Sequence, residues 1–124
     1  MEKILLVDNS SVIRKVVSKL LLDTNFKDAE ILQAENGHEA LGLVEEHGFR
    51  LIFLDLNMPL MNGFEFLKNF SKHENYSKTD IIVVTTEGSD ERKKELEDLG
   101  VHLRLLKPIR PEQFVETVNS ISIA

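Results

Sequence analysis

The chain architecture can be read from VHLRLLKP, residues 101–108, because its pattern occurs at three other places in the chain. An apolar run of strand length leads to a polar residue, here Lys107. KILLVD likewise ends at Asp8, LIFLDL carries Asp55 near its end, and DIIVVT ends at Thr85. In an open parallel sheet the carboxyl ends of the strands share one edge, and ligands bind there. The four polar residues therefore form one candidate site.

The spacing of apolar residues predicts the α/β class. Strand-like runs alternate with segments whose apolar residues recur every three or four positions, which is typical of βαβ units with a parallel sheet and helices on both faces. LIFLDL and IIVVT are continuously apolar, as strands covered on both faces are, whereas VHLRLL alternates and is expected at an edge. The expected strands are residues 3–8, 29–34, 51–56, 80–85 and 101–106.

Helical segments are expected between and after these strands. In the first, capped by Ser10 or Ser11, the stripe Val12, Val16 and Leu20 is expected to face the core, with Ile13 and Val17 beside it. The segment 89–100 is heavily charged, with only Leu96 and Leu99 apolar. The other helices are expected at residues 37–47, at 63–72 and from Pro111, which suits a first helical turn.

Composition limits the classes of function. A chain of 124 residues fits one domain, residues 1–124. The absence of cysteine excludes disulfides and thiolate metal sites. No apolar run is long enough for a signal peptide or a membrane span. A net charge of −6 argues against nucleic acid as the main ligand. We therefore expect a cytoplasmic protein without a membrane or direct nucleic-acid partner.

The four strand ends have the chemistry of a phosphoryl-transfer site. Carboxylates that share a pocket stay ionised only when a cation lies among them, and oxygen ligands without His or Cys favour Mg²⁺ over zinc. The carboxylate of Asp55, on the most apolar strand, can attack phosphorus and form an aspartyl phosphate. Lys107 would offset the added charge, and the Thr85 hydroxyl would donate to a phosphoryl oxygen.

In four motifs the chain resembles the CheY-like receiver domain of bacterial response regulators, which acts in two-component and chemotaxis signalling. The motifs are VDNS (7–10), LDLNMPLMNG (54–63), VTTE (84–87) and LLKP (105–108), in the order of the family. The resemblance implies a flavodoxin-like (βα)5 fold, a doubly wound parallel five-stranded sheet of order 2-1-3-4-5.

The same resemblance implies a signalling role rather than a conventional enzyme. A sensor histidine kinase would donate the phosphoryl group from a phosphohistidine to Asp55 in the presence of Mg²⁺. Phosphorylation would then switch a protein-binding surface made by the helix 89–99, the strand 101–106 and the last helix. The target protein is not specified by the sequence.

The resemblance also assigns residues to roles. Asp55 is the phosphoacceptor, and Mg²⁺ is held by Asp8, Asn9, Asp55 and the backbone carbonyl of Asn57. Thr85 is the conformational hydroxyl and Lys107 the phosphate-binding amine. The bond between Lys107 and Pro108 is expected to be cis, and Glu87 is expected to influence how water reaches the acyl phosphate.

The chain departs from the family pattern at three positions. Asn9 replaces a second acid, so we expect weaker metal binding. Arg104 replaces an aromatic residue, so an aromatic rotamer switch is not expected. Asn62 stands where many relatives have Asp.

These departures leave alternatives open. One is a pseudo-receiver, an interaction module that no longer needs phosphate. Another is a phosphatase of the haloacid-dehalogenase type with Asp8 as nucleophile, although Ser10 stands where that class needs an acid. A flavin binder would need glycine in the loop DNSSVIR, which has none.

Overall fold

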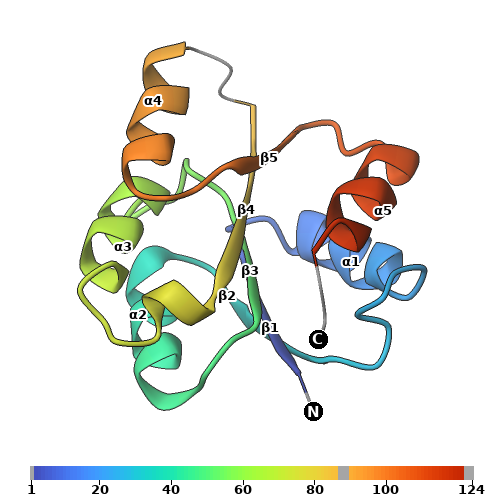
Figure 1. The fold of residues 1–124 in the computed structure, drawn as a ribbon, viewed down its shortest axis with the longest axis horizontal. Coiled ribbons are helices and arrows are strands. Elements are labelled where there is room, and N and C mark those ends of the chain that lie inside the picture. Colours follow the sequence, from blue (N-terminus) through green and yellow to red (C-terminus); the bar gives the residue numbers. More distant parts are fainter. Residues whose placement is uncertain (1, 87–89, 122–124) are drawn as a thin grey trace.

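The computed structural model describes residues 2–86 and 90–121, which form a five-stranded parallel sheet with helices on both faces (Figure 1). The elements are β1 (Lys3–Val7), α1 (Ser11–Leu21), β2 (Glu30–Ala34), α2 (Gly37–Glu46), β3 (Leu51–Leu54), α3 (Gly63–Phe70), the 3₁₀ turn η1 (Tyr76–Lys78), β4 (Asp80–Thr85), α4 (Asp90–Asp98), β5 (Leu103–Leu106) and α5 (Pro111–Asn119). The strand order is β2-β1-β3-β4-β5. The predicted class and strand order are confirmed. Glu87 and the expected helix start at Ser89 lie outside the described residues.

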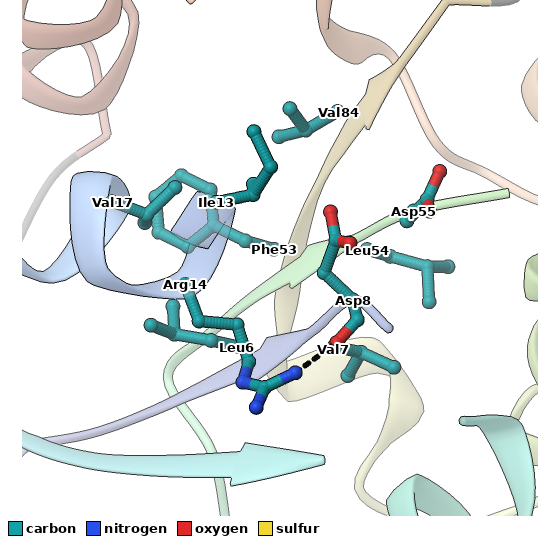
Figure 2. Close-up of a pocket in the computed structure, with 10 residues that line it drawn as sticks. All are labelled: Leu6, Val7, Asp8, Ile13, Arg14, Val17, Phe53, Leu54, Asp55 and Val84. Atoms are coloured by element: carbon teal, nitrogen blue, oxygen red, sulfur yellow. Dashed lines mark hydrogen bonds between the residues drawn. The ribbon is translucent and has the colours of Figure 1, made fainter. Parts of the chain in front are cut away.

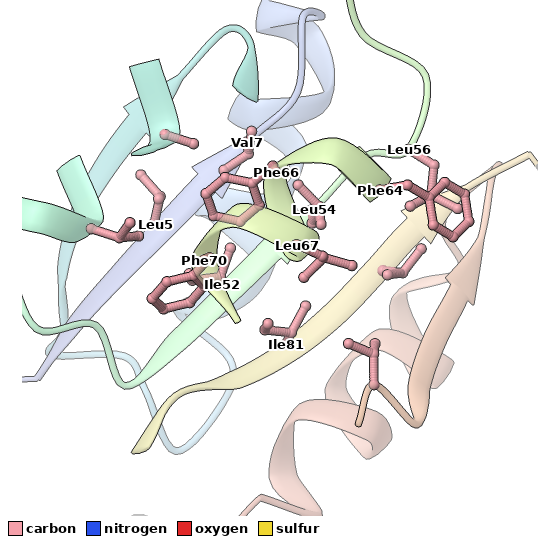
Figure 3. Packing of buried hydrophobic residues seen from close by; sticks show 14 of the residues in the cluster. Leu5, Val7, Ile52, Leu54, Leu56, Phe64, Phe66, Leu67, Phe70 and Ile81 are labelled. Carbon is pink, nitrogen blue, oxygen red and sulfur yellow. The ribbon is translucent and has the colours of Figure 1, made fainter. Parts of the chain in front are cut away.

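The sheet separates two hydrophobic cores. Helices α1 and α5 cover one face, and α2, α3 and α4 cover the other (Figure 1). The core under α2 and α3 is rich in phenylalanine, with Phe66 and Phe70 almost fully buried (Figure 3). On the opposite face the ring of Phe53 stacks on Phe114 at a centroid distance of 5.3 Å. Strand β3 is buried on both faces, which explains its uninterrupted apolar sequence.

The first helix is rotated relative to the sequence prediction. Val12 is 66% and Val16 38% exposed, and the buried residues of α1 are Arg14, Val17 and Leu21. The prediction was therefore wrong for Val12 and Val16, whereas Leu20, Ile13 and Val17 do pack in the core. Sequence periodicity allows either stripe. The observed one packs Val17 and Leu21 in the core and places Arg14 against neighbouring strands, as described below.

The edge strand β5 begins at Leu103, two residues later than predicted. Gly100 adopts a left-handed conformation (φ 80°), and Val101 donates its N–H to the carbonyl of Leu96 at 2.8 Å. With the bond from Gly100 N to Glu97 O at 2.9 Å, this is the Schellman motif that ends many helices. Val101 thus completes the end of α4 instead of extending the strand.

Within the described part of the chain, no helix is both long and apolar enough to cross a membrane.

Leu60 is the one described non-glycine residue with positive φ, at 67°, and its side chain is 79% exposed. A left-handed conformation costs a leucine about 1–2 kcal/mol, whereas asparagine tolerates it. We expect Leu60→Asn to raise the free energy of unfolding by about 0.5–1 kcal/mol, measured by urea denaturation. Leu22→Asn is the matched control, because Leu22 is 62% exposed with φ −63°. Equal effects of the two changes would show that lost exposed apolar surface, not backbone strain, is responsible.

Candidate functional site

Strand register brings two of the predicted acids to the same level. Val7 of β1 pairs with Leu54 of β3, so Asp8 and Asp55, the next residues, lie side by side just beyond the strands. The N–H of Asp55 donates to the carbonyl of Val7 at 2.9 Å, which continues the ladder to this point. Figure 2 shows both carboxylates pointing to the same side of the sheet edge. Both residues are almost fully buried.

Lys107 connects the acids to the end of β4. Its Nζ lies 3.0 Å from Asp8 Oδ2 and 3.6 Å from Asp55 Oδ2. Its backbone N–H donates to the carbonyl of Thr85 at 3.0 Å. Thr85 has no exposed surface, and the bond between Lys107 and Pro108 is cis. The four strand ends that the sequence singled out therefore meet at one edge.

The environment of Asp55 favours its protonated form. Burial raises the pKa of Asp55 above its ordinary value of 3.8. The hydrogen bond from the Asn57 N–H lowers this pKa, the negative charge of Asp8 raises it, and Lys107 lowers it. The net direction is upward, because desolvation is the largest influence. An added cation would therefore favour the ionised carboxylate.

Backbone donors orient the two carboxylates and leave oxygen atoms for a ligand. Ser10 N–H donates to Asp8 Oδ1 at 2.8 Å, and Asn57 N–H donates to Asp55 Oδ1 at 3.2 Å. Among the described residues no three His, Cys, Asp or Glu side chains are grouped as a metal site. Two carboxylates and nearby carbonyl or amide oxygens suit Mg²⁺, which binds few protein groups and keeps several waters. The residues present therefore fit this ion.

A small cavity lies beneath the acids (Figure 2). Its volume is about 10 Å³, close to the minimum that holds one water molecule. It is lined by Leu6, Val7, Asp8, Ile13, Arg14, Val17, Phe53, Leu54, Asp55 and Val84. Any ligand or reaction partner of Asp55 therefore binds at the edge of the sheet and not inside this cavity.

Arg14 supports the site, and our sequence analysis missed it. The side chain donates from Nη1 to the backbone carbonyl of Asp8 (Figure 2) and from Nε to Gln33 Oε1 at 2.7 Å. These two bonds connect Asp8, the residue after β1, to α1 and β2. The sequence did contain an indication that Arg14 is buried. It lies three residues before Val17 and seven before Leu21, so the three residues share one helical face.

The loop after Asp55 is fixed by the start of α3. The Asn62 side chain accepts from Glu65 N–H at 2.9 Å, and the Glu65 side chain accepts from Asn62 N–H at 3.2 Å. This capping box gives Asn62 a structural role that an Asp could also perform. Gly63, the first residue of α3, packs directly on the backbone of Asp55 and Leu56. The loop between them is consequently short and rigidly anchored.

Comparison with known proteins identifies the family. The family model described as "Response regulator receiver domain" matches residues 4–119. The chain belongs to this family. It is 34% identical over 119 residues to the probable transcriptional regulator ycf29 of Pyropia yezoensis, covering 96% of this chain and 52% of that protein. The receiver domain thus spans about half the length of that relative.

Other relatives are similar in length to this receiver domain. A chemotaxis protein CheY homolog of Campylobacter jejuni is 32% identical over 120 residues, covering 96% of this chain and 91% of that protein. The solved structure of the chemotaxis protein CheY4 of Vibrio cholerae has a TM-score of 0.86 and 38% identity, covering 98% of this chain and 99% of that one. The flavodoxin-like fold expected for a CheY-like receiver is thereby confirmed.

Proposed function

We propose that this receiver domain accepts a phosphoryl group on Asp55 from the phosphohistidine of a sensor histidine kinase. The observation that carries the proposal is the position of the Lys107 ammonium, 3.0 Å from Asp8 and 3.6 Å from Asp55. An amine held beside two carboxylates can neutralise the charge that a phosphoryl group adds to one of them. Asp8 supplies the second carboxylate for a cation.

The proposed step exchanges one bond to phosphorus for another. A carboxylate oxygen of Asp55 forms a bond to phosphorus while the bond from phosphorus to the donor imidazole nitrogen breaks, and that nitrogen keeps the electron pair. The Asn57 N–H and Lys107 hold Asp55 during the step. Lys107 and the Thr85 hydroxyl then bind the phosphoryl oxygens. The site promotes its own phosphorylation but does not turn over a separate substrate.

Mg²⁺ would be held by Asp8, Asp55, the Asn57 carbonyl and the Asn9 amide oxygen, and when bound it supplies positive charge that offsets the charge on the transferred group. Asn9 and Asn57 are exposed to solvent, so water can complete the coordination of the ion.

The output of this signal is proposed to be protein association in the cytoplasm. The surface combines the edge strand β5, which leads to Lys107, with α4 and α5, which flank it on opposite faces of the sheet (Figure 1). The relatives named as chemotaxis proteins support a role in such signalling. Phosphorylation changes partner affinity only if one conformer makes better contacts with the phosphoryl group, here through Thr85 and Lys107.

Mass spectrometry tests the phosphoacceptor directly. Incubation with acetyl phosphate and Mg²⁺ is expected to add one phosphoryl group to the intact protein, and Asp55→Asn is expected to remove the adduct completely. Asp98→Asn, at an exposed acid of α4, is the control and should keep it. No adduct on the unaltered protein, or an adduct that survives Asp55→Asn, would refute the assignment.

Asn9→Asp should strengthen Mg²⁺ binding, because a carboxylate adds a negative charge that an amide lacks. We expect the dissociation constant to fall about tenfold, the equivalent of about 1.4 kcal/mol. Isothermal titration calorimetry at constant ionic strength measures it, with Asn69→Asp at an exposed position of α3 as the control for net charge. Equal affinities of the Asn9→Asp variant and the unaltered protein would contradict a metal-binding role for position 9.

Asn9 also favours the second candidate, a pseudo-receiver that binds its partner without phosphate. The two functions differ in one measurement. Partner capture that is identical for the phosphorylated protein and for Asp55→Asn would favour the pseudo-receiver, whereas capture that depends on the adduct supports the phosphorylation switch.

A further inference from the structure

Among the described residues, Arg14 of α1 is a buried cation that the proposed phosphoryl transfer does not use. Its side chain is 10% exposed, and it lies on the helical face that packs Val17 and Leu21 in the core. A buried cation is costly unless its donors have acceptors. The acceptors of Arg14 therefore indicate what this residue does.

The acceptors of Arg14 lie at the ends of two neighbouring strands. Nη1 donates to the backbone carbonyl of Asp8 (Figure 2), and Nε donates to Gln33 Oε1 at 2.7 Å. Nη2 lies 3.9 Å from Glu35 Oε1, but the Glu35 side chain is 70% exposed, so this ion pair contributes little. Nε and Nη1 point in different directions in the rigid, planar guanidinium, which can therefore form both hydrogen bonds at once. Gln33 thus fixes the group that contacts Asp8.

The carbonyl that accepts from Arg14 belongs to the peptide group between Asp8 and Asn9. A peptide group is planar, so fixing its oxygen fixes the plane and the direction in which the chain leaves β1. On one side of this plane the N–H of Asp8 donates to the carbonyl of Ala34 at 3.1 Å. On the other side the N–H of Ser10 donates to Asp8 Oδ1 at 2.8 Å. The bond from Arg14 therefore fixes the backbone that orients both Asp8 and Asn9.

We propose that Arg14 is a positioning residue for the candidate Mg²⁺ site: it orients Asp8 and Asn9 through the Asp8 carbonyl, and Gln33 fixes its own position. The part of this proposal that concerns the ion rests on the proposed function. The printed bonds of Arg14 go to protein groups, so it acts on the ion through the ligands. Removal of a group that orients metal ligands typically weakens metal binding about 10–100-fold.

The charge of Arg14 and its positioning role have opposite effects on metal binding. A guanidinium that acted only through its positive charge would repel Mg²⁺, so its removal would strengthen binding. A guanidinium that orients the ligands strengthens binding, so its removal weakens binding even though the repulsion is lost. The sign of the change therefore separates the two roles.

Isothermal titration calorimetry with Mg²⁺ measures this sign. Arg14→Met is expected to raise the dissociation constant about tenfold, and Gln33→Leu, which changes no charge, about threefold. Lys19→Met removes the same charge from an exposed position of α1 and should not raise it. Val118→Ala opens a cavity in the core shared by α1 and α5, which lowers stability, and should leave the affinity unchanged. An unchanged or lower dissociation constant for Arg14→Met, or an equal rise in Val118→Ala, overturns the proposal.

The amide signal of Ser10 reports the position of Asp8 without any metal. The Ser10 N–H donates to Asp8 Oδ1, whereas the Asn57 N–H donates to Asp55 Oδ1. In ¹H–¹⁵N spectra recorded without Mg²⁺, Arg14→Met is expected to shift the Ser10 signal upfield, because its bond to the carboxylate is weakened. The Asn57 signal should keep its position. No shift at Ser10, or equal shifts at both amides, would show that Arg14 does not act on Asp8 specifically.

The two measurements distinguish this proposal from the proposed function. If the unaltered protein binds no Mg²⁺, the proposed metal site is wrong, and the Ser10 signal still decides whether Arg14 orients Asp8. If the unaltered protein binds Mg²⁺ and forms the Asp55 adduct, but Arg14→Met binds the ion equally well, the proposed function stands and the role of Arg14 is wrong. Gln33→Leu keeps both measurements valid if Arg14→Met impairs folding, since Gln33 is exposed.

Discussion

Gly63→Ala is expected to lower the free energy of unfolding by about 3 kcal/mol and to disturb Asp55. An alanine Cβ at this position would lie 2.6 Å from the carbonyl oxygen of Asp55 and 2.9 Å from the Cα of Leu56. Both atoms are backbone, so neither can move aside as a flexible side chain would. To remove this steric clash, α3 would have to shift away from the loop, and such a shift is opposed by the capping box of Asn62 and Glu65. Urea denaturation measures the loss.

Gly42→Ala is the matched control for this change. Gly42 lies inside α2, and an added Cβ there would meet no atom within 4 Å. Alanine is favoured over glycine in a helix interior, so this variant should gain about 0.5–1 kcal/mol. If both variants change stability in the same direction, the close contact of Gly63 with Asp55 is not the cause. A normal yield of phosphorylated Gly63→Ala protein would show that Asp55 keeps its position despite the contact.

Lys107→Met is expected to lower the free energy of unfolding by about 2–3 kcal/mol near neutral pH, because it leaves two buried carboxylates without their cation. The side chains of Lys107, Asp8 and Asp55 are 18%, 7% and 5% exposed. Methionine retains an apolar chain of similar length, so the change removes charge more than volume. The same variant should phosphorylate more slowly, since the proposed phosphate-binding amine is gone.

The pH dependence of this loss follows from the raised pKa of Asp55. Burial raises that pKa and Lys107 partly lowers it, so removing Lys107 raises it further. Between the ordinary value of 3.8 and the raised value, folded protein binds more protons than unfolded protein. Stability therefore falls as pH rises through this window. The deficit of Lys107→Met relative to the unaltered protein should be largest near neutral pH and shrink toward about pH 4.

Two further variants make this prediction specific. Lys15→Met, at an exposed position of α1, should cost little at any pH. In an Asp55→Asn background, Lys107→Met should cost less than it does alone, because only one charged partner remains. A deficit that does not vary with pH, together with additive effects in the double variant, would show that Lys107 acts through packing instead of charge.

Much of the candidate site was predictable because it depends on local sequence. Asp8, Asp55, Thr85 and Lys107 each follow an apolar run, and parallel strands place such residues at one edge whatever the details of packing. The geometry agrees with this expectation for all four. Their roles in phosphoryl transfer and metal binding remain predictions.

Other features were not predictable because they depend on contacts between distant segments. The buried face of α1 packs Val17 and Leu21 in the core and carries Arg14, which bonds to the end of β1 and to Gln33 of β2. Two apolar stripes of similar quality were available to that helix, so periodicity could not choose between Val12 and Val17. The need for glycine at position 63 likewise arises from its approach to Asp55, eight positions earlier in the chain.

Sequence alone determined the α/β class, the alternation of strands and helices, and which polar residues meet at the sheet edge. These properties arise from short apolar runs of strand length and from the helical period of about 3.6 residues, both of which depend only on residues close together in the sequence. Only the tertiary structure decided the rotation of α1, the contact of Gly63 with Asp55, and the distances from the Lys107 ammonium to Asp8 and Asp55. These features depend on distances between elements far apart in the chain, and such distances are set by how side chains pack across the sheet.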